Sequence, residues 1–187
     1  NINKSKKNFN YQSIDINDYN AIKEFVKKIY DKTNKIDGLI NIAGISLNNT
    51  YTLSNFNETT NTNLVSTFNI INETIKYMKV KKSGSIINFT SIGAFKGFSK
   101  NPAYVSSKGA LNSLSKAIAL DHGKYNIRVN NIVPGYIKTQ MTKKSYTNKS
   151  KSKIRMERTI LGKWGSTKDL VGPTIFLLSA VTKSQIN

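Results

Sequence analysis

Three residues of the sequence, Ser91, Tyr104 and Lys108, have the types and spacing to act on one reacting oxygen. Tyr104 and Lys108 are four positions apart at the start of a segment with helical character, so both side chains project from one face. Ser91 follows residues 84–90, an apolar run typical of a buried strand. Open α/β sheets bind ligands at the carboxyl ends of their strands. The pattern therefore predicts that the three head groups share a site.

The tyrosine-lysine spacing alone is weak evidence, because a lysine-rich chain produces it by chance. The same spacing follows Tyr19 and Tyr77. By itself, the pair indicates a solvated helix face. Only Tyr104 has a serine 13 positions earlier, Ser91, and this strand-borne serine favours a catalytic site.

The three side chains suit proton transfer to a carbonyl oxygen. A free tyrosine has a pKa of about 10, and a neighbouring ammonium such as that of Lys108 favours the phenolate and lowers this pKa. Tyr104 could donate a proton to a carbonyl oxygen, or take one from an alcohol, with Ser91 hydrogen-bonded to the same oxygen. No side chain can donate a hydride, so this chemistry implies a nicotinamide cofactor.

Seven short pieces resemble, in order and spacing, the short-chain dehydrogenase/reductase family, and the resemblance covers nearly all 187 residues. The pieces are residues 41–44 (NIAG), 63–64 (NL), Ser91, 104–108 (YVSSK), 128–130 (RVN), 134–139 (PGYIKT) and 161–165 (LGKWG). The family implies that Tyr104 is the acid/base and that Ser91 contacts the substrate oxygen. It implies that Lys108 stabilises the phenolate and binds the cofactor ribose. Asn63 would complete a tetrad by holding a water in the proton relay.

The resemblance also implies contacts with NAD or NADP, made by Asp15, Ile16, Asn41, Ala43, Gly44, Tyr104, Lys108, Pro134, Gly135, Ile137 and Thr139. Asp15 would touch the adenine, or it could be only a helix cap, and both roles can hold. Gly44 could be only a turn glycine, and Ile137 and Thr139 ordinary loop residues. Ile42 stands where the family usually has a second asparagine. No side-chain contact with the cofactor is therefore expected there, but contacts through the backbone would remain. The choice between NAD and NADP stays open.

The expected fold class is α/β, a Rossmann-like doubly wound parallel sheet in three α/β/α layers, as one partial domain over residues 1–187. Strands are expected at residues 11–15, 36–44, 84–90 and 126–135. Helices are expected at residues 19–32, 58–78 and 103–123, with a loop at 45–57. A capping-box pattern at residues 166–169 predicts a last helix to about residue 181, in which Pro173 is unexpected.

The glycine-rich phosphate-binding turn that opens the domain in this family does not occur in the sequence. We therefore expect the chain to be an internal fragment that lacks the first two βα units and the C-terminal end. The functional expectations then describe the parent protein. Whether the fragment binds cofactor without this turn stays open.

Composition excludes some classes of site. The sequence has no cysteine and one histidine, His122, so it can form neither a disulfide nor a cysteine or histidine metal cluster. A metal site is not expected. No apolar stretch approaches 18 residues and no signal-peptide pattern occurs, so we expect a soluble, cytoplasmic protein without membrane contact.

The net charge of +19 raises nucleic-acid binding as a competing class. The chain has only three arginines, Arg128, Arg155 and Arg158, whereas arginine is the residue favoured for phosphate recognition. The lysines are spread along the chain without a pattern of stacking aromatics. No specific nucleic-acid partner is therefore expected, although weak, salt-sensitive association with polyanions stays open.

The expected partners are a small carbonyl or alcohol substrate and further copies of the chain. Residues 140–158 are basic and of low complexity, and form either a disordered loop or a lid over the substrate. The small residues Ser107, Ala110, Ser113 and Ala117 permit helix pairing in a dimer or tetramer, or internal packing. By resemblance, the substrate is a sugar acid or a 3-oxoacyl carrier-protein thioester. A noncatalytic relative that binds a dinucleotide or a polyanion is the alternative of a different class.

Overall fold

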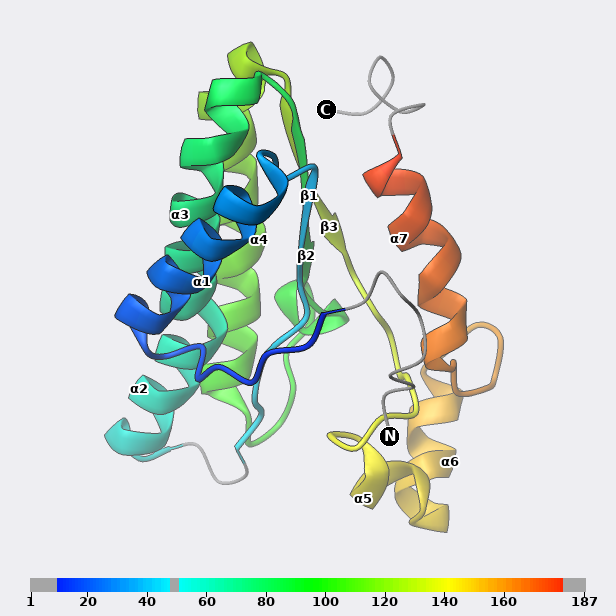
Figure 1. The fold of residues 1–187 in the computed structure, drawn as a ribbon. Coiled ribbons are helices and arrows are strands. Elements are labelled where there is room, and N and C mark those ends of the chain that lie inside the picture. Colours follow the sequence, from blue (N-terminus) through cyan, green and yellow to red (C-terminus); the bar gives the residue numbers. More distant parts are fainter. Residues whose placement is uncertain (1–9, 48–50, 180–187) are drawn as a thin grey trace.

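A computed structural model describes residues 10–47 and 51–179, in which helices flank a parallel sheet (Figure 1). The strands β1 (Gly38–Asn41), β2 (Gly84–Phe89) and β3 (Ile127–Ile132) are hydrogen-bonded in the order β1-β2-β3, and both neighbouring pairs are parallel. Helices α1 (Tyr19–Thr33), α3 (Ser66–Lys81) and α4 (Pro102–His122) lie on one side of the sheet, and α7 (Val171–Leu178) lies on the other. The expected α/β fold is confirmed, as a partial sheet.

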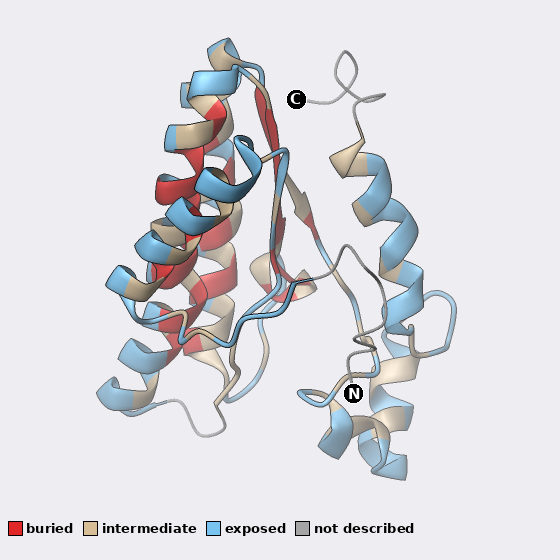
Figure 2. Cartoon of the chain, viewed as in Figure 1, coloured by how far each residue is buried: buried red, intermediate tan, exposed pale blue. Residues whose placement is uncertain are grey.

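The core lies between the sheet and helices α3 and α4, where most buried residues gather (Figure 2). Met78 from α3 and Ile118 from α4 pack with Ile86 and Ile127 of the two adjacent strands. Gly84 begins β2 without a side chain, and a Cβ there would overlap Met78. This close packing fixes β2 against α3, and Ile118 anchors α4, which carries two of the candidate residues, in the same core.

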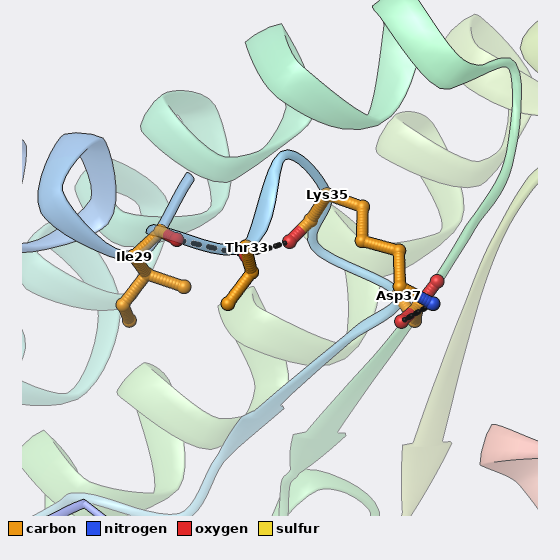
Figure 3. Close-up of polar contacts among 4 residues, drawn as sticks. All are labelled: Ile29, Thr33, Lys35 and Asp37. Atoms are coloured by element: carbon orange, nitrogen blue, oxygen red, sulfur yellow. Dashed lines mark hydrogen bonds and ion pairs between the residues drawn. The ribbon is translucent and has the colours of Figure 1, made fainter. Parts of the chain in front are cut away.

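Helix α1 ends in a short turn that leads into β1 (Figure 3). Asn34 adopts the left-handed conformation that commonly ends helices, with φ 54°. The Thr33 hydroxyl lies 2.8 Å from the carbonyl oxygen of Ile29 and 2.6 Å from that of Lys35. The Lys35 ammonium lies 2.9 Å from the Asp37 carboxylate. These contacts fix where α1 stops and where β1 begins.

Two expected elements are wrong. Residues 11–15 form no strand, because no described strand lies beside them to pair with their backbone. The helix expected from residue 58 begins earlier, as α2 (Leu53–Thr60), because the Thr52 hydroxyl caps it by accepting a hydrogen bond from the Asn55 N–H at 3.2 Å. Helix α2 then passes through a π-helical turn, η1 (Asn61–Val65), into α3.

The basic segment 140–158 is largely helical, so of the two alternatives the disordered loop is wrong, and the lid over the substrate stays a prediction. It forms α5 (Lys143–Tyr146) and α6 (Lys149–Glu157), the second capped by Asn148. The segment is flanked by Ile137 and Gly165, which are joined by an isolated parallel bridge. We call residues 138–164, which lie between Ile137 and Gly165, the cap.

The expected capping box at Ser166 is confirmed. Its N–H and hydroxyl lie 2.6 and 3.2 Å from the Asp169 carboxylate, and it opens a 3-10 turn, η4 (Thr167–Leu170), that continues into α7. Because α7 begins only at Val171, Pro173 falls in its first turn, where a backbone N–H has no partner within the helix. The expected end near residue 181 lies outside the described residues.

Three of the four small residues on α4 face outward. Ala110, Ser113 and Ala117 are exposed, whereas Ser107 is buried. The exposed residues leave this helix surface open to a second copy of the chain, and pairing there stays a prediction. In the part of the chain that the structure describes, no helix is both long enough and apolar enough to cross a membrane.

Candidate active site

Ser91 lies just beyond the carboxyl end of β2. The backbone of Thr90 still pairs with β3, since its N–H donates to the carbonyl of Ile132 at 2.9 Å. Ser91 is extended and caps a short 3-10 turn, η2 (Ile92–Ala94), with its Oγ accepting the N–H of Gly93 at 3.0 Å. The side chain is buried at 7% exposure. The end of the strand and the turn together fix the position of the hydroxyl.

Tyr104 and Lys108 lie one turn apart near the start of α4. Pro102 occupies the first turn, where its fixed φ suits a helix start. The Lys108 Nζ lies 5.9 Å from the centre of the Tyr104 ring. It also donates a hydrogen bond of 2.7 Å to the carbonyl of Phe89, the last residue of β2. Lys108 thus ties the helix to the strand that leads to Ser91.

Burial dominates the ionisation of both groups on α4. It raises the pKa of Tyr104, and the hydrogen bond between Tyr104 and Ser91 lowers it by less. It lowers the pKa of Lys108 to about 8. The structure therefore favours a raised pKa for Tyr104 instead of the expected lowered one, because desolvation disfavours the phenolate more than the Ser91 hydrogen bond favours it.

Asn63 lies on the π-helical turn η1, fully buried. Its amide clamps the backbone of Ile45: Oδ1 accepts the N–H at 2.7 Å, and Nδ2 donates to the carbonyl at 2.9 Å. The second hydrogen of Nδ2 goes to the hydroxyl of Ser107 on α4, at 3.0 Å. Asn63 therefore holds the loop after β1 against α4. Single π-helical turns are frequent at functional sites.

A cleft of about 610 Å³ opens at the carboxyl ends of the strands, within the range of small-ligand sites. Of the predicted residues, its lining includes Gly44, Ser91, Tyr104, Lys108, Pro134, Gly135, Ile137 and Thr139. The opposite wall is mostly apolar and comes from η4 and α7 through Leu170, Val171, Ile175 and Leu178. The sequence analysis missed this wall. The cleft lining also includes Gln140, Met141 and Thr142, which begin the segment 140–158 that was expected to be either a disordered loop or a lid.

Four predicted cofactor contacts and Asn63 lie outside this lining. Asp15 is exposed and accepts the N–H of Asn17 at 2.9 Å, as a turn residue does. Ile16 follows in the same turn, and Ala43 is exposed. The Asn41 amide is buried in the sheet, where it donates to Asn88 Oδ1 at 2.8 Å. Among residues 10–47 and 51–179, no cluster of side chains is placed to hold a metal ion.

The family model for the short chain dehydrogenases matches residues 1–150. The chain therefore belongs to the short-chain dehydrogenase family, whose members are oxidoreductases. It is 32% identical over 173 residues to a 2-dehydro-3-deoxy-D-gluconate 5-dehydrogenase of Dickeya dadantii, which covers 90% of this chain and 68% of the relative. It is also 32% identical over 175 residues to a 3-oxoacyl-(acyl-carrier-protein) reductase of Chlamydia pneumoniae, covering 92% of this chain and 70% of the relative.

Solved structures share the fold. A gluconate 5-dehydrogenase from Burkholderia cenocepacia, in complex with NADP and tartrate, superposes with a TM-score of 0.88 at 26% identity. The match covers 92% of this chain and 69% of that one. The chain spans between 60% and 70% of the length of the curated relatives it matches.

Proposed function

We propose that the parent protein of this chain interconverts a secondary alcohol and a ketone with NAD(H) or NADP(H). The observation that supports this most directly is that Ser91, Tyr104 and Lys108 line one cleft. In reduction, Tyr104 would give its proton to the carbonyl oxygen while Ser91 hydrogen-bonds the same oxygen. The raised pKa of Tyr104 keeps it protonated at neutral pH, as a donor must be.

The cofactor would lie in the cleft beside Gly44. A Cβ added there would lie 3.1 Å from Asn63 Oδ1 and 3.5 Å from Lys108 Nζ, so bare backbone leaves room beside the lysine. When bound, the nicotinamide supplies or accepts the hydride. Lys108 would hold the ribose, and Gly44, Pro134, Gly135, Ile137 and Thr139 would form the walls. Contacts by Asp15, Ile16, Asn41 and Ala43 are proposed from family resemblance alone.

Asn63 is proposed to complete the proton relay through a water. Both hydrogens of its amide are already donated, one to Ile45 and one to Ser107, so a relay water would have to bind an oxygen of Asn63. Its two bonds to Ile45 also give it a positioning role for the loop that carries Gly44.

Two substrate classes follow from the relatives: sugar acids, as for the Dickeya enzyme, and 3-oxoacyl thioesters, as for the Chlamydia enzyme. The test is a nicotinamide absorbance assay on the full-length parent with one ketone of each class and each cofactor. We expect turnover of at least one pair. A folded protein that binds NAD(H) or NADP(H) but turns over neither class would favour the noncatalytic alternative.

The reduction rate is expected to fall as the pH rises through about 8. Burial lowers the pKa of Lys108 from 10.5 to about 8, so its ammonium is present below this pH and lost above it. Without the ammonium, the phenolate that forms on Tyr104 loses its stabilising charge. The check is a pH profile of kcat for ketone reduction at saturating cofactor. A profile that stays flat to about pH 10 would show that the ammonium is not required.

A further inference from the structure

The loop of residues 137–142 carries two of the predicted cofactor contacts, and both line the cleft. The first end of the loop is fixed by Gly165, whose N–H donates to the Tyr136 carbonyl at 2.9 Å and whose carbonyl accepts the Lys138 N–H at 2.9 Å. A Cβ added to Gly165 would lie 2.6 Å from the Ile137 side chain. This approach is so close that the first end of the loop has little room to shift.

The other end of the loop is fixed by the hydroxyl of Thr142. Its Oγ1 lies 2.6 Å from the carbonyl oxygen of Ile137 and accepts the N–H of Thr139 at 2.9 Å. It also lies 3.2 Å from the carbonyl oxygen of Thr139 and 3.3 Å from the Thr139 hydroxyl. The carbonyl of Thr142 accepts the N–H groups of Ser145 and Tyr146, at 2.8 and 3.1 Å, where α5 begins. One residue thus joins both cleft-lining contacts to the first helix of the cap.

The hydrogen of the Thr142 hydroxyl has one best acceptor. A hydroxyl has a single hydrogen to donate and two lone pairs to accept. Hydrogen bonds from a hydroxyl to an oxygen are usually about 2.5–3.0 Å long, so the hydrogen goes to the Ile137 carbonyl rather than to either oxygen of Thr139. Thr142 therefore gives no hydrogen to the Thr139 hydroxyl oxygen, which keeps its lone pairs available to a donor in the cleft.

We propose that Thr142 is a positioning residue for the nicotinamide end of the cofactor. Its hydroxyl holds the loop so that Thr139 presents an acceptor oxygen to the cleft, and the carboxamide NH₂ of nicotinamide is a donor that suits this oxygen. The inference rests on the proposed function, because it requires a nicotinamide cofactor in the cleft. A loop held in place before binding loses little conformational freedom when the ligand arrives, so the Thr142 hydroxyl raises cofactor affinity by acting through the loop.

The first test is a direct titration of the full-length parent with NADH or NADPH, whichever it binds more tightly, and with the matching ADP-ribose, which lacks nicotinamide. Thr142→Val removes the hydroxyl and keeps the shape of the side chain, whereas Thr142→Ser keeps the hydroxyl. We expect the valine variant to bind the dinucleotide about tenfold more weakly or worse, and ADP-ribose within about twofold of the wild type. The serine variant should recover most of the dinucleotide affinity.

Thr159→Val is the matched control for Thr142→Val. Thr159 is also a half-buried residue of the cap, and its hydroxyl donates to the Met156 carbonyl at 2.8 Å, away from the cleft lining. The control should leave both affinities nearly unchanged. General damage to the fold would weaken dinucleotide and ADP-ribose alike, so the ratio of the two affinities separates positioning of the nicotinamide from loss of structure.

A second test addresses the acceptor oxygen of Thr139. The 3-acetylpyridine analogue of the dinucleotide carries a methyl group in place of the carboxamide NH₂. We expect the wild type to bind this analogue about tenfold more weakly than the nicotinamide form, and Thr142→Val to bind the two forms about equally. The comparison on the wild type decides whether a donor is recognised there even if Thr142→Val does not fold.

Three results would overturn the positioning proposal: unchanged dinucleotide affinity in Thr142→Val, equal weakening of dinucleotide and ADP-ribose, or no preference of the wild type for nicotinamide over acetylpyridine. The titrations need no turnover, so failure of positioning is distinguishable from failure of hydride transfer. A parent with the expected affinities that reduces neither class of ketone would count against the proposed function alone. A parent that binds neither NADH nor NADPH would reject both.

Discussion

Replacement of Tyr104 by phenylalanine in the full-length parent is expected to lower kcat by about 10²–10⁴-fold and leave cofactor affinity largely intact. The change removes the proposed proton donor and reduces the side-chain volume by only one hydroxyl oxygen. The hydrogen bond with Ser91 is also lost, but Ser91 keeps its bond from the Gly93 N–H, so the end of β2 should hold its shape. The measurements are steady-state kinetics and a direct titration with the nicotinamide cofactor.

Tyr77→Phe is the matched control, because Tyr77 has the same spacing to a lysine but stacks on Tyr30, with ring centres 4.3 Å apart. It should retain wild-type turnover. Activity of Tyr104→Phe within about threefold of the wild type would remove Tyr104 from the proposed chemistry.

Replacement of Lys108 by methionine is expected to impair both kcat and cofactor binding, each by about tenfold or more. The ammonium is proposed to stabilise the phenolate of Tyr104 and to hold the ribose. It also donates to the Phe89 carbonyl, so the variant leaves that oxygen without this donor and should lose about 1–3 kcal/mol of unfolding free energy. Kinetics, cofactor titration and thermal unfolding measure the three effects separately.

Lys81→Met is the control for Lys108, since Lys81 follows Tyr77 at the same spacing and lies exposed at the end of α3. It should change none of the three quantities by much. A Lys108→Met protein that lost only stability would assign the lysine a structural role alone, and one that lost only kcat or only cofactor affinity would disprove the dual role.

The sequence predicted the residues whose spacing follows from regular geometry. Tyr104 and Lys108 share a face because a helix repeats every 3.6 residues, and Ser91 follows the buried run that becomes β2. These are local relations, so a single sequence contains them. The cleft brings the three residues together, while their catalytic roles stay predictions.

Other features depend on contacts between distant segments. The clamp of Asn63 on Ile45 spans 18 positions, and no local pattern predicts it. The apolar wall from α7 reaches the cleft only because that helix packs on the opposite side of the sheet. The raised pKa of Tyr104 likewise follows from tertiary burial, whereas the sequence shows only the nearby lysine.

The helices of the cap were missed for a different reason. Residues 143–153 are mostly lysine, serine and asparagine, with little apolar periodicity to predict a helix. Their packing is organised by Tyr136 and Trp164, which lie outside that stretch. Composition indicated disorder because Tyr136 and Trp164, the rings on which Tyr146 and the neighbouring Arg155 pack, are not within the stretch.

Ile137 and Gly165 form a bridge, so the chain enters and leaves the cap at residues that lie side by side. The entropy of closing a loop grows only slowly with its length, so a cap of another size could be inserted between these residues at modest cost to the sheet. Selection could therefore exchange this segment while Ser91, Tyr104 and Lys108 stay in place. Such an arrangement allows a single insert to change while the rest of the cleft keeps its residues, and it marks residues 138–164 as the place where engineering for a new ligand should begin.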